Sequence, residues 1–116
     1  MSASPSFIEE ITDLHAEVCS ALADSTRILL IYSLAEKPRN VGDLAQQLGI
    51  SQPAASRHLK ILRERGLVHA VRQGACVEYH LVDHRLVDAL DLLRDVLRDR
   101  LTRRASLVEA DLSTAE

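Results

Sequence analysis

Residues 51–68 read SQPAASRHLKILRERGLV, and this stretch decides the fold of the 116-residue chain. Ser51 offers a hydroxyl that can accept a hydrogen bond from the free amides of a first helical turn. Pro53 falls in that turn, where its missing N–H costs nothing. Gly66 supplies the left-handed backbone that ends a helix. The stretch therefore predicts a helix that begins after Ser51 and ends before Gly66.

The two sides of this helix differ in chemistry. Ala55, Leu59 and Leu62 recur at helical spacing and are expected to face a core. The polar and basic side chains then face outward: Gln52, Ser56, Arg57, Lys60 and Arg63. Hydroxyl and amide groups near a helix N-terminus can reach base edges, and basic side chains can pair with guanine or phosphate. The pattern is typical of a DNA recognition helix; an ordinary solvated amphipathic helix is the alternative.

A second short helix is expected just before it. Residues 40–49, NVGDLAQQLG, place Val41, Leu44, Ala45 and Leu48 on one face, and a glycine ends the stretch. The connection Gly49-Ile50-Ser51 leads directly into the next helix. Two short helices joined by a glycine-containing turn of this length indicate a helix-turn-helix.

Residues 67–81, LVHAVRQGACVEYHL, predict a β-hairpin after the recognition helix. Apolar residues alternate with polar ones in its second half, with Ala75, Val77, Tyr79 and Leu81 against Cys76, Glu78 and His80. Arg72 and Gln73 are expected at or near the tip. A hairpin in this place predicts a winged helix, whose wing lies along the DNA backbone.

Charge is distributed unevenly along the chain. The whole sequence carries a formal net charge of −3, from 14 basic and 17 acidic residues. Residues 51–73 nevertheless hold a local +4, which leaves −7 for the rest. A concentrated basic patch is the electrostatic footprint of phosphate binding. Aromatic residues make up 3% of the chain, so stacking on single-stranded bases is not expected, and duplex DNA is the better partner.

Length and composition limit the kinds of protein that this sequence can encode. With 116 residues, of which 47% are hydrophobic, a single globular domain with its own core is expected. We see no apolar stretch as long as a membrane span and no signal-peptide layout. Two cysteines far apart in sequence fit a reducing compartment better than a disulfide framework. We therefore expect a cytoplasmic protein with no membrane partner.

Helices of another kind are expected on both flanks. Residues 7–22 carry a wide apolar stripe, and Asp24 and Ser25 can cap a further, nearly apolar helix that ends near Glu36 and forms the buried spine. Residues 84–101 repeat leucine at intervals of four and three. The pattern weakens after Thr102, which predicts a domain over 1–104 and a frayed tail over 105–116.

The leucine stripe of residues 84–101 would be exposed to water unless another apolar surface packs against it. It could pack within the chain, but three helices already suffice for the core of a winged helix. We favour pairing of two subunits about a two-fold axis, since a symmetric dimer sets two recognition helices roughly 34 Å apart on successive major-groove faces.

Three motifs together resemble the ArsR/SmtB family of dimeric bacterial repressors: ALADSTRILLIYSL (21–34), SRHLKILRERGLV (56–68) and VEYHL (77–81). The resemblance covers residues 21–101. It implies a mainly α winged helix-turn-helix with five helices, the wing between the fourth and fifth, a dimer formed by the first and last helices, and operator DNA with an inverted repeat. It places Gln52, Ser56, Arg57, His58, Arg72 and Gln73 near DNA, and Ser51, Lys60 and Arg63 complete the candidate DNA-binding residues.

The family's metal sites are not reproduced in this sequence. Many metal-sensing members carry two cysteines in the third helix, but the matching segment here, RNVGDL (39–44), has no thiol. Zinc and nickel sensors use an Asp and a His, then a His and a Glu, on the fifth helix. Asp83 is present, but the other positions hold Arg85, Val96 and Asp99, which do not make a zinc site.

Two thiols remain as candidates for sensing an effector. His15 and Cys19 are four residues apart, so on a helix they would lie about 5–6 Å from each other and could share a soft cation. Further ligands would have to come from a partner's last helix, for instance Asp91 or Asp95. The alternative is that Cys19 is a small buried hydrophobe. Cys76 is expected to face solvent, open to oxidation or metalation, or to be an incidental strand cysteine.

The sequence thus predicts a homodimeric winged-helix repressor that an effector releases from its operator. The effector could be a soft metal, arsenite, an oxidant or reactive sulfur, and the one cofactor that the sequence leaves open is a thiol-bound soft metal or metalloid. A constitutive repressor without an effector and a winged-helix protein-interaction module are the alternatives. An enzyme is not expected, because no nucleophile and base pair, phosphate loop or metal cluster has useful spacing. The remaining histidines, His69, His80 and His84, are expected as scattered surface residues.

Overall fold

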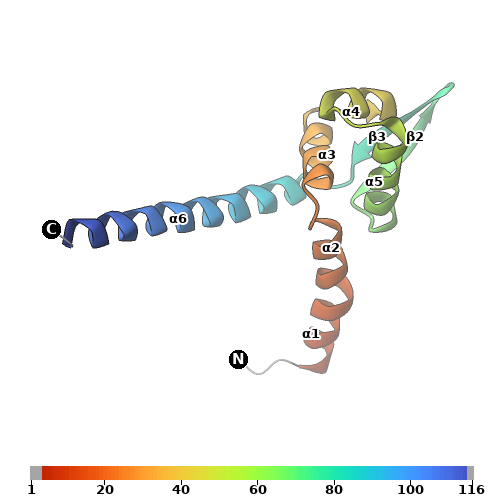
Figure 1. Cartoon of the computed structure of the whole chain (residues 1–116). Coiled ribbons are helices and arrows are strands. Elements are labelled where there is room, and N and C mark those ends of the chain that lie inside the picture. Colours follow the sequence, from red (N-terminus) through yellow and green to blue (C-terminus); the bar gives the residue numbers. More distant parts are fainter. Residues whose placement is uncertain (1–3, 115–116) are drawn as a thin grey trace. The chain divides into compact units, whose positions relative to one another are not determined.

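The computed structural model describes residues 4–114, which divide into two compact units, residues up to 83 and residues from 84. Helical and extended segments follow one another in the order that a winged helix requires (Figure 1). The helices are α1 (Pro5–Glu10), η1 (Ile11–His15), α2 (Ala16–Ala21), α3 (Ser25–Glu36), α4 (Val41–Leu48), α5 (Gln52–Glu64) and α6 (Arg85–Thr114). The strands are β1 (Arg39–Asn40), β2 (Val68–Gln73) and β3 (Cys76–Leu81). Because α1, η1 and α2 run on without a break, the described chain has five helical stretches, as expected.

Helix α3 is the spine of the first unit. It contacts α4, α5 and β3, and its Leu30, Ile31 and Leu34 are buried. The matching core residues of α5 are Ala55, Leu59 and Leu62, all fully buried, as their spacing predicts. The helix expected as the buried spine is nevertheless exposed at one position on its surface, since Leu29 is 55% exposed.

Local capping explains where the three central helices begin. The Asp24 carboxylate accepts from the amides of Thr26 and Arg27 at the start of α3. Asn40 caps α4, and Ser51 caps α5 by accepting from the amide of Ala54 (3.2 Å). Each cap satisfies amides that have no partner inside the helix.

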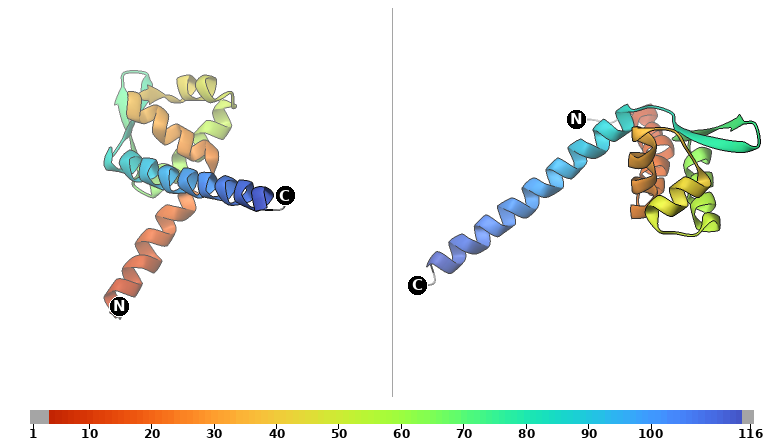
Figure 2. Two further views of the ribbon diagram at one scale, coloured as in Figure 1. Left: turned by 90° about the vertical axis from the view of Figure 1, so that its left-hand side faces the viewer. Right: turned by 90° about the horizontal axis from the view of Figure 1, so that it is seen from above.

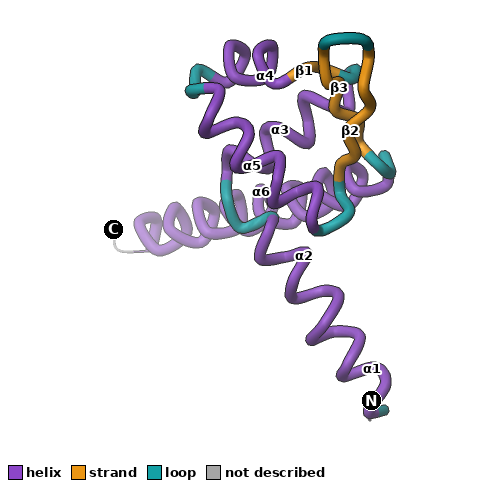
Figure 3. The backbone as a smooth tube through the Cα atoms, turned by 90° about the vertical axis from the view of Figure 1, so that its right-hand side faces the viewer, coloured by secondary structure: helices purple, strands orange, loops and turns teal. Residues whose placement is uncertain are grey.

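The sheet has three antiparallel strands in the order β1-β3-β2, one more than the hairpin expected from the sequence (Figure 3). Strand β1 pairs Arg39 with Tyr79 and Asn40 with Glu78. A strand of two residues is too short to carry an alternating pattern, which is why the sequence does not predict it. The apolar side chains of β3 are buried only at one end of the strand, because Leu81 is buried while Val77 is exposed.

The two terminal helical stretches present apolar side chains to solvent. Phe7, Ile8, Ile11 and Leu14 are exposed along α1 and η1. Helix α6 is one uninterrupted helix (Figure 2). Its exposed apolar residues include Leu93, Val96, Leu97 and Leu101. Helix α6 continues as far as Thr114, through most of the tail expected over 105–116, and the last two residues of that tail lie outside the described part.

No single helix in residues 4–114 is long and apolar enough to cross a membrane. The stretch Pro5–Ala21 and helix α3 reach that length and composition only as a pair, across a bend of 86°.

Candidate nucleic-acid interface

Helices α4 and α5 are joined by a tight left-handed turn. Gly49 has φ +68°, and the amide of Ile50 donates to the carbonyl of Ala45 (3.0 Å). This is the hydrogen bond that closes a Schellman motif, and it satisfies a carbonyl at the end of α4. A Cβ atom on Gly42 would lie 3.3 Å from the side-chain nitrogen of Gln52, so the two helices approach closely where α5 begins. The predicted helix-turn-helix is confirmed.

The outward side of α5 carries the predicted polar and basic residues, and we call it the α5 polar face. Its members are all exposed: Gln52, Ser56, Arg57, Lys60 and Arg63. The opposite side of the same helix is the buried apolar row. Helix α5 ends as predicted, since Gly66 has φ +74° and the amide of Leu67 donates to the carbonyl of Leu62 (2.9 Å).

The wing presents its predicted tip residues to solvent. Gln73 pairs with Cys76 as the last pair of the hairpin, Arg72 precedes it, and Gly74 and Ala75 form the turn. Arg72, Gln73 and Cys76 are all exposed, as expected. In Figure 1 and in the right-hand view of Figure 2 the hairpin reaches beyond α4 and α5.

Among the candidate DNA-binding residues, His58 alone is not classed as exposed. It is half-buried, and its Nδ1 lies 3.3 Å from Nη1 of Arg27 on α3. Sequence reasoning missed Arg27. The available signal was a single basic residue in the first turn of a largely apolar helix, where a cation needs partners if it is to be buried.

Arg27 and Asp24 interact at the start of α3. Nη1 of Arg27 lies 3.9 Å from Oδ2 of Asp24, whose Oδ1 accepts from the Arg27 amide (3.2 Å). The hydrogen bond from that amide, reinforced by the guanidinium charge, holds the pKa of Asp24 below its ordinary value against the opposing effect of desolvation. The cap is therefore a carboxylate at neutral pH.

Two histidines on the wing are less scattered than expected. His69 and His80 are directly opposite each other on β2 and β3, and their rings stack with centroids 5.1 Å apart. His80 Nε2 also lies 2.9 Å from a carboxylate oxygen of Glu78. The expectation of unrelated surface residues is wrong for this pair, because it depends on the strand register.

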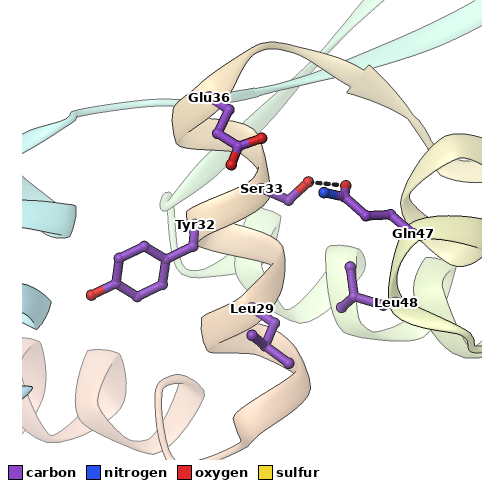
Figure 4. A pocket seen from close by; sticks show the side chains of 6 residues that line it. All are labelled: Leu29, Tyr32, Ser33, Glu36, Gln47 and Leu48. Atoms are coloured by element: carbon purple, nitrogen blue, oxygen red, sulfur yellow. Dashed lines mark hydrogen bonds between the residues drawn. The ribbon is translucent and has the colours of Figure 1, made fainter.

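A groove of about 380 Å³ lies between α3 and α4 (Figure 4). Two of the residues that line it form a short hydrogen bond, in which the Ser33 hydroxyl donates to the Gln47 side-chain oxygen. Ser33 is buried, so this hydrogen bond satisfies a polar group inside the fold. It also links α4, the first helix of the helix-turn-helix, to α3.

The structure brings His15 and Cys19 together, as their spacing predicts. Both line a small depression of about 230 Å³, with Leu14 and Val18. Both cysteines are free, and both are exposed in a single copy of the chain. His15 also lies 3.9 Å from a carboxylate oxygen of Glu10. No group of three His, Cys, Asp or Glu side chains within the described residues is placed to hold a metal ion.

Comparisons with known proteins agree with this geometry. A family model for "Bacterial regulatory protein, arsR family" matches residues 24–70. The chain is 43% identical over 77 residues to the HTH-type transcriptional repressor SmtB of Mycobacterium tuberculosis. That alignment covers 66% of this chain and 57% of the relative, so the chain spans little more than half the length of that repressor.

Solved structures extend the likeness over more of the chain. The crystal structure of NolR from Sinorhizobium fredii is 32% identical, with a TM-score of 0.72 over 83% of this chain and 95% of that one. A homodimeric winged helix-turn-helix DNA-binding domain, Mb0332 from Mycobacterium bovis, has a TM-score of 0.73 at 28% identity, over 87% of this chain and 94% of that one. The fold is a winged helix-turn-helix, and the chain belongs to the ArsR/SmtB family of bacterial regulatory proteins.

Proposed function

We propose that this protein is a transcriptional repressor that binds duplex DNA through α5 and the wing. The observation that carries the proposal is the α5 polar face, whose five side chains are exposed while the opposite side of the same helix is buried. Residues 51–73, which contain this face and the wing's first strand, carry a local +4 within an acidic chain, and this charge attracts phosphate. Arg72 and Gln73, exposed near the wing tip, extend the contact along the backbone, and a chromosomal operator implies a cytoplasmic location.

The DNA-binding form is a homodimer on an inverted repeat. The exposed apolar residues of α1, η1 and α6 would remain in water in a single copy, and a second copy can cover them. One structural relative is described as homodimeric. Two-fold symmetry in the protein is matched by an inverted repeat in the DNA.

Selection of duplexes from a random pool by the wild-type chain tests this function, and the enriched sequence should contain an inverted repeat. Fluorescence anisotropy against that duplex and a scrambled one then measures specificity. The change Arg57→Ala should weaken binding and lower the dependence of log affinity on log salt by about one unit. The matched control is Lys37→Ala, which removes an exposed cation outside the α5 polar face.

A protein-interaction module is the competing function. It predicts only weak binding that does not distinguish the selected duplex from the scrambled one. Equal affinity for both duplexes, with Arg57→Ala behaving like Lys37→Ala, would contradict the repressor proposal.

Release from DNA depends on an effector that reacts with Cys19 or Cys76. An effector that binds the DNA-incompetent state more tightly lowers operator affinity by a coupling free energy of about 1–3 kcal/mol. Cys19 lies beside His15 in an open depression, which favours a soft cation or metalloid there. The variants Cys19→Ser and Cys76→Ser should identify the responding thiol when bound complexes are challenged with arsenite, zinc, cadmium, hydrogen peroxide or a polysulfide. If both variants release DNA like the wild type, the thiols are not the sensor.

A further inference from the structure

Arg27 joins the end of α2 to α5 through one side chain. Its guanidinium donates from Nε to the carbonyl of Ala21 and from Nη2 to the carbonyl of Ser20 (3.5 Å). Nη1 of the same group reaches Nδ1 of His58. The Arg27 side chain is only 14% exposed, so these contacts are largely shielded from water. A hydrogen bond is electrostatically stronger in such a low-dielectric environment than in water.

The chemistry of arginine decides the state of the His58 ring. A guanidinium is always protonated and can only donate hydrogen bonds. Nδ1 of His58 must therefore be the acceptor, which leaves the proton of the neutral ring on Nε2. A doubly protonated ring would point an N–H at the guanidinium and could not make this hydrogen bond. The contact thus selects one tautomer.

The other edge of the ring is available for binding. Nε2 of His58 has no hydrogen bond to any residue that the structure describes, and it is not among the buried unpaired atoms, so it reaches solvent. His58 follows Ser56 and Arg57 of the α5 polar face in the sequence. A single N–H donor here can be accepted by a phosphate oxygen or by a purine N7.

We propose, on the basis of the proposed DNA-binding function, that Arg27 is a positioning residue that presents the Nε2–H of His58 to DNA as a hydrogen-bond donor. Arg27 itself does not touch the DNA. The same guanidinium holds the carbonyls at the end of α2, so a displacement of α2 changes the orientation of a DNA-contacting side chain.

The first test measures the tautomer without DNA. Nitrogen-15 NMR of the histidine rings should show wild-type His58 protonated at Nε2 and bare at Nδ1. The change Arg27→Gln should convert this to a mixture of tautomers. The matched control is Arg39→Gln, since Arg39 is also mostly buried and bonded to Glu36 and the Ser33 carbonyl, on elements other than α5. An unchanged His58 signal in Arg27→Gln would overturn the proposal.

The second test compares two replacements of His58 on the selected duplex. In His58→Gln the amide nitrogen lies near the former Nε2 and can donate to DNA. In His58→Asn the side-chain oxygen lies near the former Nδ1 and can accept from Arg27, but nothing occupies the Nε2 position. We expect His58→Gln to retain affinity and His58→Asn to lose about three- to tenfold, the effect of one hydrogen bond.

The reverse order, or equal affinities, would show that His58 acts only inside the fold and would overturn the proposal. Arg27→Gln should weaken binding as His58→Asn does, while Arg39→Gln should not. Thermal unfolding checks that each variant folds, and the two His58 variants test the proposal if Arg27→Gln does not fold. Failure of the wild type to select any duplex would instead overturn the proposed function, while the tautomer measurement still reports on the Arg27 contact.

Discussion

The rings of His69 and His80 stack across β2 and β3, with their centroids 5.1 Å apart and their planes inclined by 16°. Directly opposed side chains are the unit of sheet stabilisation, and each pair contributes about 0.2–1 kcal/mol relative to alanine. The stack lies toward the end of the hairpin nearer the core, where Val68 and Leu81 are buried. The His69–His80 stack therefore stabilises the packing of the exposed wing against the rest of its unit.

His69→Ala should loosen the wing without unfolding the helices. We expect amide hydrogen exchange in β2 and β3 to accelerate by a factor that corresponds to about 0.2–1 kcal/mol. The control is His84→Ala, which changes an exposed histidine that precedes α6. Equal exchange in the two variants would show that the stack does not stabilise the wing.

Asp24 should make the stability of α3 sensitive to acid. Its pKa is lower in the folded state than in the unfolded chain, because the Arg27 amide and guanidinium favour the carboxylate. The stabilisation is therefore present above the unfolded pKa and is lost as pH falls through the folded pKa. Urea midpoints at pH 7 and below pH 4 should differ more for the wild type than for Asp24→Asn, which keeps a capping side chain that does not titrate. The same pH dependence in both proteins would exclude Asp24 as the source.

Leu59 and Leu29 offer a matched pair of leucines for the core. Leu59 is fully buried on α5, while Leu29 is mostly exposed on α3. Leu59→Ala should lower the free energy of unfolding by about 2–5 kcal/mol, through lost transfer energy and a residual cavity. Leu29→Ala should change it by less than about 0.5 kcal/mol. Urea unfolding at one protein concentration measures both, and a large effect of Leu29→Ala would show that this side chain is covered in solution.

Ser51 should contribute to stability through its cap alone. Ser51→Ala removes the acceptor for the Ala54 amide and should cost about 0.5–2 kcal/mol, whereas Ser51→Asn should be nearly neutral. Thermal unfolding of both variants in the absence of DNA provides the comparison. If Asn is as destabilising as Ala, the hydroxyl has a role other than capping.

Much of the candidate site could be predicted because its determinants are local. Ser51, Gly49 and Gly66 define the ends of their helices through capping and left-handed backbone, and these depend on a few neighbouring residues. The spacing of Ala55, Leu59 and Leu62 likewise decides which side of α5 is buried. Because these residues fix the buried side of α5, the polar face could be predicted as the opposite, exposed side.

Other features depend on which distant segments meet. The order of residues determined the helix-turn-helix, the buried side of α5 and the residues at the wing tip, because helical periodicity, caps and turn glycines act over a few residues. Only the tertiary structure decided that β1 joins the sheet, that His69 stacks on His80, and that His58 turns to Arg27, 31 residues away in the chain. Such contacts arise from packing and strand register, which set the distances between side chains far apart in sequence.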